Sequence, residues 1–221
     1  MVGIGASAGG LAAFEAFFSG MPADRNPGMA FVLVQHLAPD HESILTELIR
    51  RCTRMEVLQI TNRVTVKPDC VYIIPPNHNL AFMHGCLYLT NPEQPHGRRL
   101  PIDFFFRSLA LDLGDRAICI VLSGTGSDGS DGALAIKAAG GLVMAQTPGS
   151  TDYDGMPRSV IATGCVDYQL IPQEMASQLL VYASRAFIRH PHAAVQPSPD
   201  AEQDLTKIFL LLRDRTGHDF S

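Results

Sequence analysis

Short, uninterrupted apolar segments alternate along most of this chain with segments in which apolar residues recur at helical spacing. The apolar segments lack polar alternation, which is typical of strands covered on both faces of a parallel sheet. The alternation predicts an α/β fold with a doubly wound, mostly parallel sheet flanked by helices. The predicted strands are Val2–Ile4, Met29–Gln35, Cys70–Ile74, Ala117–Leu122, Leu142–Ala145 and Cys165–Tyr168. The predicted helices are Leu11–Phe18, Ser43–Arg51, Ile102–Leu113, Gly129–Ala139, Met156–Thr163 and Pro172–Ile188.

One antiparallel feature is expected within this pattern. Leu80–Met83 and Leu87–Leu89 are strand-like, and the dipeptide His84-Gly85 lies between them. A short connection that contains glycine is typical of a tight β-hairpin. We therefore expect an antiparallel hairpin beside the parallel sheet.

The composition changes near the end of the chain. Residues 189–203 are rich in proline and show no apolar periodicity, which is typical of a linker. Helical spacing resumes at Leu205–Leu212 and then stops. We expect one domain over residues 1–188, a linker over 189–203, and the truncated start of a further helical domain over 204–221.

Composition excludes several classes of protein. Of the 221 residues, 46% are hydrophobic, which is ordinary for a globular protein and too apolar for a disordered one. No apolar run approaches the roughly 20 residues of a membrane span, and the first residues lack the features of a signal peptide. Five cysteines without close pairing argue against a disulfide framework and favour the cytoplasm. A net charge of −5 argues against a nucleic-acid binder.

Two glycine-rich loops each follow a predicted strand and enter a predicted helix. The loop from Gly3 fits the pattern GxGxxA, and the loop from Gly124 fits GxGxxG, so both have the form of a dinucleotide-binding turn. Against this hypothesis, the second strand ends without the acidic residue that holds a ribose, since the first acid after it is Asp40. A dinucleotide-binding enzyme therefore remains the weaker hypothesis.

Three side chains suggest a serine hydrolase instead. Ser7 lies on the first glycine turn, where the start of a helix supplies backbone N–H donors near Ala8. His36 ends the adjacent strand and can accept the serine proton. Asp128, in the second glycine loop, can orient the imidazole. All three follow strands, and open α/β sheets place their sites at the carboxyl ends of strands.

Each of these residues also has a purely structural interpretation. Ser7 and Asp128 could each cap the helix that follows them. His36 could be an ordinary histidine of the core or of a loop. Asp131 is a rival acid, although it falls within the first turn of a predicted helix. No cysteine or histidine set at recognisable spacing indicates a metal site.

Six segments of the chain resemble the catalytic domain of chemotaxis protein methylesterases of the CheB type. They are GIGASAGG, FVLVQHLAP, VYIIPPNHNL, RLPIDFFFRSLA, IVLSGTGSDGSDG and MPRSVIATG, and the match runs collinearly from Met1 to about Ile188. The resemblance implies hydrolysis of glutamyl methyl esters on the cytoplasmic helices of chemoreceptors, with release of methanol. It also implies deamidation of certain glutamines, and it implies no metal or organic cofactor.

The resemblance assigns roles to individual residues. Ser7 matches the nucleophile, His36 the base and Asp128 the acid of the family's triad. Thr125 matches a position that contributes to oxyanion stabilisation, where the family commonly has methionine. Ala8 stands where the family often has threonine. Alanine there removes a hydroxyl from the site. If a main-chain N–H at Thr125 stabilises the oxyanion, the change of side chain at that position has little effect.

The last residues carry a second resemblance. The segment LTKIFLLLRDRTGHDF, residues 205–220, looks like the start of a methyltransferase domain of the CheR type. The pairing is similar to long fusion proteins in which esterase, methyltransferase and sensor-kinase modules share one chain. The implied partners are a methylated chemoreceptor or related signalling protein and downstream methyltransferase and sensor modules, with no nucleic acid and no membrane insertion. A non-catalytic module that docks on receptors is the remaining alternative.

Overall fold

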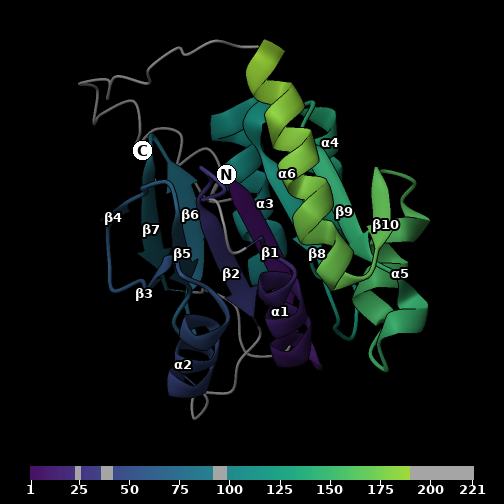
Figure 1. Ribbon diagram of the computed structural model, residues 1–221, viewed down its shortest axis with the longest axis horizontal. Coiled ribbons are helices and arrows are strands. Elements are labelled where there is room, and N and C mark those ends of the chain that lie inside the picture. The colour runs from purple at the N-terminus through teal and green to yellow at the C-terminus, as the bar shows by residue number, and fades with distance from the viewer. Residues whose placement is uncertain (23–25, 36–41, 92–98, 190–221) are drawn as a thin grey trace, which may run out of the picture.

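A computed structural model of the chain describes residues 1–22, 26–35, 42–91 and 99–189 (Figure 1). Seven strands form one sheet in the order β10-β9-β8-β1-β2-β5-β3, and each neighbouring pair in it is parallel. The predicted parallel sheet is therefore confirmed. Its strands are β1 (Val2–Ala6), β2 (Phe31–Gln35), β3 (Glu56–Gln59), β5 (Cys70–Ile73), β8 (Ile118–Val121), β9 (Leu142–Gln146) and β10 (Tyr168–Leu170).

Helices cover both faces of this sheet, as a doubly wound fold requires. Helices α1, α2 and α6 pack on one face, in an apolar core that includes Phe14 and Leu179. Helices α3, α4 and α5 pack on the other face, in a core that includes Phe105 and Val160. In Figure 1, α1 and α6 lie in front of the sheet and α3 lies behind it. The helices are α1 (Gly10–Ser19), α2 (Glu42–Cys52), α3 (Pro101–Leu113), α4 (Ser130–Ala138), α5 (Gly155–Ala162) and α6 (Pro172–Arg189), with short 3-10 turns at η2 (Gly114–Arg116) and η3 (Pro148–Ser150).

The predicted hairpin forms part of a second, smaller antiparallel sheet. His84 and Gly85 have φ angles of 47° and 76°, and a two-residue hairpin turn favours positive values at both positions. The N–H of Phe82 donates to the Ser108 hydroxyl at 2.9 Å, which fixes the hairpin against α3. The strands of this sheet are β4 (Val64–Thr65), β7 (Cys86–Thr90) and β6 (Asn79–Met83), in that order.

The sequence pattern missed one strand of the large sheet. Strand β3 pairs in parallel with β5 at the edge of the sheet. Its first residue, Glu56, is exposed while Val57 is buried, so the segment lacks the continuous apolar run that marked the inner strands. An edge strand needs fewer apolar side chains, which explains why this one was not predicted.

The predicted position of the last strand was wrong. The strand begins at Tyr168, not at Cys165, and runs to Leu170. Just before it, the Asp167 carboxylate accepts the N–H of Val143 at 3.0 Å and pairs with Lys137. A polar contact thus precedes the strand where an extended apolar run was expected.

Apart from Arg189, the predicted linker and the predicted further domain lie outside the described residues. Those two predictions are therefore not tested. Within the described ranges, no helix is both long enough and apolar enough to cross a bilayer. All five cysteines are free thiols.

Candidate active site

Ser7 lies at the carboxyl end of β1, in the middle of the sheet. β1 pairs with β2 on one side and with β8 on the other, so the segments that follow these three strands leave the same edge. The N–H of Ser7 donates to the carbonyl of Ser123 at 2.9 Å, and the Ser7 carbonyl accepts the N–H of Gly10 at 2.9 Å. These bonds close a tight turn that holds the half-buried Ser7 at the predicted edge.

Ser7 is not the cap of the helix that follows it. The N-cap residue of α1 is Gly9, and no side chain caps this helix. Gly9 has a left-handed φ of 71°, and a Cβ there would lie 2.6 Å from the Ser123 hydroxyl oxygen and 2.9 Å from the Tyr153 ring. Both the backbone conformation and the close approach require glycine. The structural interpretation of Ser7 as a cap is therefore wrong.

Ser123, two residues after the end of β8, joins the Ser7 turn to the loop before α5. Its side chain is 1% exposed. The hydroxyl oxygen lies 2.8 Å from the Ala8 carbonyl and 2.7 Å from the Thr151 hydroxyl. The Ser123 N–H donates to Oε1 of Gln146 at 2.8 Å. The Ser7 turn is thus held through both the main chain and the side chain of one buried residue.

The second glycine loop passes directly beside Ser7. A Cβ on Gly124 would lie 3.0 Å from Cβ of Ser7 and 2.2 Å from Sδ of Met156, so glycine is needed there. The Thr125 side chain is exposed. Within the described part of the chain, the N–H groups of Ala8 and Thr125 donate no hydrogen bond. Two main-chain donors are therefore available for an oxyanion.

Asp128 is 3% exposed and caps a helix other than its own. Its Oδ2 accepts the N–H of Ile102 at 3.0 Å, and its Oδ1 accepts the N–H of Asp103 at 2.9 Å. Both donors belong to the first turn of α3, whereas the N-cap position of α4 is Gly129 and Asp128 caps no N–H of that helix among the described residues. The interpretation of Asp128 as the cap of the helix that follows it is wrong. Each carboxylate oxygen can accept a second hydrogen bond, so the group can still serve an imidazole.

Ile102 links α3 to the Ser7 strand. A Cβ on Gly5 would lie 2.4 Å from Cγ2 of Ile102, and a Cβ on Gly129 would lie 3.0 Å from the same atom. The start of α3 therefore fills the space that both glycines leave open. Packing within the chain accounts for Gly5, without any role in binding a dinucleotide.

The rival acid Asp131 points away from this arrangement. Its carboxylate is 61% exposed and pairs with the Arg107 guanidinium at 2.9 Å on the outer surface of α3 and α4. A solvated ion pair of this kind is unsuited to orienting a catalytic imidazole. Of the two candidate acids, the buried Asp128 is the better placed.

His36 lies outside the described residues, so its predicted role is not tested. Gln35, which precedes it, pairs with Ala6 at the end of β1. Its amide nitrogen donates to the Ser7 carbonyl at 3.4 Å. Its Oε1 is buried and has no hydrogen-bond partner among the described residues. An unused acceptor therefore lies near the Ser7 turn.

A family model for the CheB methylesterase matches residues 2–179. The chain belongs to the CheB methylesterase family. The crystal structure of the Thermotoga maritima CheB methylesterase catalytic domain superposes with a TM-score of 0.74 at 28% identity, covering 82% of this chain and 97% of that one. The predicted α/β fold is thus the fold of this family.

Several curated relatives cover most of the described domain. Protein-glutamate methylesterase/protein-glutamine glutaminase 2 of Pseudomonas aeruginosa is 32% identical over 189 residues, which is 84% of this chain and 53% of the relative. The corresponding protein of Bdellovibrio bacteriovorus is 32% identical over 184 residues, 81% of this chain and 51% of the relative. A 104.1 kDa protein of Rhodobacter capsulatus is 42% identical over 126 residues, 57% of this chain and 13% of that protein. The chain spans about half the length of the methylesterase relatives.

Sequence analysis missed the residues that support this CheB-type site. Ser123 and Gln146 hold the Ser7 turn and the loop before α5, and both follow or end buried strands at the same edge as Ser7. A polar residue at the carboxyl end of an apolar strand is a signal that could have found them. Asp103, buried in the first turn of α3, carries no such signal.

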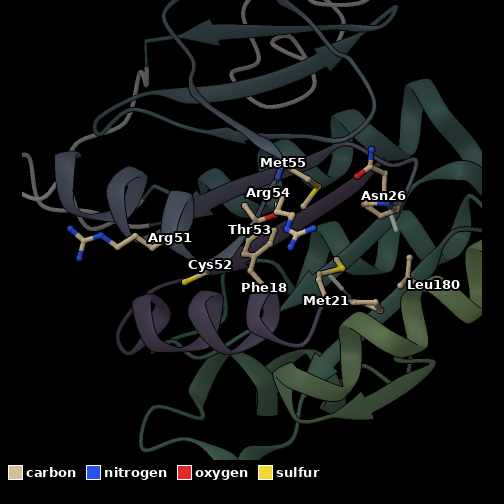
Figure 2. A pocket seen from close by; sticks show the side chains of 11 residues that line it. Phe18, Met21, Asn26, Arg51, Cys52, Thr53, Arg54, Met55 and Leu180 are labelled. Carbon is tan, nitrogen blue, oxygen red and sulfur yellow. Dashed lines mark hydrogen bonds between the residues drawn. The ribbon is translucent and has the colours of Figure 1, made fainter. Parts of the chain in front are cut away.

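One cavity of the described part of the chain lies away from this site (Figure 2). It has a volume of about 250 Å³ and lies between the ends of α1 and α2 and helix α6, where Phe18, Cys52 and Leu180 line it. Ser7 precedes the opposite end of α1, so the cavity is no part of the candidate site. Among the described residues, no group of three or more His, Cys, Asp or Glu side chains is arranged to hold a metal ion.

Proposed function

We propose that this chain hydrolyses glutamyl methyl esters on the cytoplasmic helices of a chemoreceptor or related signalling protein and releases methanol. The observation that carries the proposal is the fixed turn of Ser7. It lies beside the N–H groups of Ala8 and Thr125, which donate no hydrogen bond within the described residues. Membership in the CheB family supports the proposal, and the relatives from Pseudomonas aeruginosa and Bdellovibrio bacteriovorus are named protein-glutamate methylesterases.

The first half of the reaction acylates Ser7. The Ser7 hydroxyl oxygen attacks the ester carbonyl carbon while His36 takes the hydroxyl proton. The pairing of Gln35 with Ala6 supports His36 as this base, because His36 directly follows Gln35 in the chain. Asp128 accepts a hydrogen bond from the other ring nitrogen and stabilises the imidazolium that forms.

Main-chain N–H donors stabilise the negative charge that develops on the substrate. The carbonyl oxygen becomes an oxyanion in the tetrahedral intermediate, and the N–H groups of Ala8 and Thr125 donate to it. Collapse of the intermediate breaks the bond to the methoxy group, which takes the proton from His36 and leaves as methanol. Water then attacks the acyl ester of Ser7 in the same way, which frees the glutamate and restores the serine.

The same chemistry accounts for deamidation of glutamine. The side-chain amide presents the same carbonyl to Ser7, and ammonia leaves in place of methanol after protonation by His36. Both reactions pass through one acyl ester and consume one water. Neither reaction requires a metal or an organic cofactor, because the base, the acid and the oxyanion donors all come from the chain.

We further propose that the domain over residues 1–188 is followed by a linker over 189–203 and by the start of a methyltransferase-like domain over 204–221. The similarity to part of a 104.1 kDa protein supports a place in a longer chain. The downstream methyltransferase and sensor modules are then partners in the same chain, in the cytoplasm, where the substrate helices of a chemoreceptor lie.

The test is release of methanol from methylated receptor membranes by the chain and by two variants, Ser7→Ala and His36→Gln. We expect both variants to lose activity by on the order of 10³- to 10⁶-fold, because the groups of a triad act as a unit. Ser184→Ala is the matched control, since the Ser184 hydroxyl donates to the Val181 carbonyl on the exposed side of α6.

Three outcomes would contradict the proposal. Full activity in Ser7→Ala would exclude Ser7 as the nucleophile. A folded parent chain that binds receptor membranes without releasing methanol, equally well with and without Ser7→Ala, would indicate the docking module instead. Saturable binding of NAD or FAD, abolished by a bulkier residue at Gly126, would favour the dinucleotide-binding enzyme.

A further inference from the structure

Helices α3 and α4 exchange caps across their first turns. Asp128, just before α4, accepts the N–H groups of Ile102 and Asp103 in the first turn of α3 at 3.0 Å and 2.9 Å. In return, Oδ1 of Asp103 accepts the N–H of Gly132 in the first turn of α4 at 2.7 Å. The residues at the two N-cap positions, Leu100 and Gly129, supply no side-chain cap. Each helix start therefore depends on a carboxylate from the other.

The backbones of the two first turns are in contact, so that neither can move alone. A Cβ on Gly132 would lie 2.6 Å from Cβ of Phe106, 3.0 Å from Cα of Asp103 and 3.1 Å from the Asp103 carbonyl. Closely packed interiors transmit displacements instead of absorbing them. A shift of the α4 first turn therefore moves the carboxylate of Asp128, which precedes that turn by two residues.

Asp103 is a buried ionisable group that the proposed reaction does not use. Its side chain is 2% exposed. Burial raises the pKa of Asp103 to about 6, and the nearby charges of Asp128 and Asp131 add to the rise, while Arg107 and the N–H of Gly132 oppose it. An uncharged acceptor would meet the N–H of Gly132 without this cost. The stability of the fold therefore does not explain why a carboxylate stands at this position.

We infer that Asp103 is a positioning residue of the candidate active site: by holding the N–H of Gly132 it fixes the first turn of α4 against α3 and so sets the position of the Asp128 carboxylate. The inference rests on the proposed function, in which Asp128 orients His36. The charged form of Asp103 makes the stronger hydrogen bond to Gly132, because charge-assisted hydrogen bonds are shorter and stronger than neutral ones.

The kinetic test compares Asp103→Ala and Asp103→Asn with the parent chain in release of methanol from methylated receptor membranes. Asp103→Ala should lower kcat by on the order of 10- to 100-fold with KM nearly unchanged, because misplacing a catalytic group by about 1 Å has effects of this size. Asp103→Asn keeps an acceptor and should restore kcat to within a few-fold of the parent. Asp112→Ala is the matched control, since the Asp112 carboxylate accepts the N–H of His84 at the far end of α3.

The pH dependence separates positioning from a general loss of stability. The parent and Asp103→Asn differ only in this one ionisable group, the Asp103 carboxyl, so the ratio of kcat of the parent to kcat of Asp103→Asn reports the effect of its charge. This ratio should be close to one below about pH 6 and should rise a few-fold above it, as Asp103 becomes charged. A ratio that is constant with pH, or a folded Asp103→Ala with unchanged kcat, would overturn the inference.

Hydrogen exchange tests the helix contact without any assay of activity. The N–H of Ile102 donates to Asp128, so its exchange should speed up at least tenfold in Asp103→Ala and stay unchanged in Asp112→Ala. If Asp103→Ala fails to fold, Asp103→Asn takes its place. A smaller increase in the exchange rate of the Ile102 N–H is then expected, measured under conditions in which the variant stays folded. Unchanged exchange at Ile102 would refute the inference even if methanol release is observed. Absence of methanol release with faster exchange would refute the proposed function and leave the contact established.

Discussion

Replacing Asp103 by asparagine should make the protein more stable at neutral and alkaline pH, although it removes a charged hydrogen bond. The reason is that the folded protein holds this carboxyl in a buried place beside the Asp128 carboxylate, where its ionised form is disfavoured. Asparagine has nearly the same shape and keeps an oxygen for the N–H of Gly132. It does not ionise.

The size of the effect follows from the pKa of Asp103. Burial, reinforced by the charge of Asp128, raises this pKa from 3.8 to about 6. A carboxyl with a raised pKa binds its proton more tightly in the folded state than in the unfolded one. Its contribution to the free energy of unfolding is therefore complete below pH 3.8 and is lost as the pH rises through about 6. At about 1.4 kcal/mol per pKa unit, the loss reaches about 3 kcal/mol above pH 7.

Chemical denaturation from about pH 4 to about pH 8 measures this difference. The free energy of unfolding of Asp103→Asn, relative to the parent, should rise with pH and level off above about pH 7. Asp112→Asn removes a carboxylate from the same helix and should not reproduce this rise. A difference between Asp103→Asn and the parent that is independent of pH, or that changes sign in favour of the parent as the pH rises, would refute the reasoning.

Two further predictions concern the loops around Ser7. Gly124→Ala places a methyl group 2.2 Å from Sδ of Met156 and 3.0 Å from Cβ of Ser7, so kcat for methanol release should fall by on the order of 100-fold. Gly126→Ala is its control: nothing lies near the added Cβ, and a φ of 81° should lower stability by about 1–2 kcal/mol without a comparable loss of kcat. Ser123→Ala removes a buried hydroxyl that contacts the Ala8 carbonyl, and should lower the free energy of unfolding by about 1–3 kcal/mol in denaturation experiments and lower kcat as well.

The inner part of the fold was predictable because burial on both faces leaves a simple mark in the sequence. Strands β1, β2, β5, β8 and β9 are fully or almost fully buried, and their continuous apolar runs predicted them. Strand β3, at the edge, has only Val57 buried and gave no such signal. The start of β10 was misplaced because the apolar character of Cys165 and Val166 belongs to a connection that packs on the core without joining the sheet.

The candidate site was predictable in its chemistry but not in its supports. Ser7 and Asp128 each follow a predicted strand, which is the signal that marks them as site residues, and the structure brings their loops to one edge of the sheet. The cap that Asp128 provides to α3 joins residues 25 positions apart along the chain. Capping rules relate a side chain to the helix next to it in sequence, so the exchange of caps with Asp103 had no local pattern from which it could be predicted.

The contacts that hold this site together come largely from the main chain. The Ser7 turn is fixed by its own N–H and carbonyl, and Asp128 is held by two N–H groups of α3. The two positions that differ from the family's common residues, Ala8 and Thr125, contribute N–H groups in the proposed reaction, which any residue other than proline supplies. Their side chains can therefore vary while the geometry persists. Glycine at position 124 cannot vary in this way, because a side chain there would enter the space of Ser7 itself.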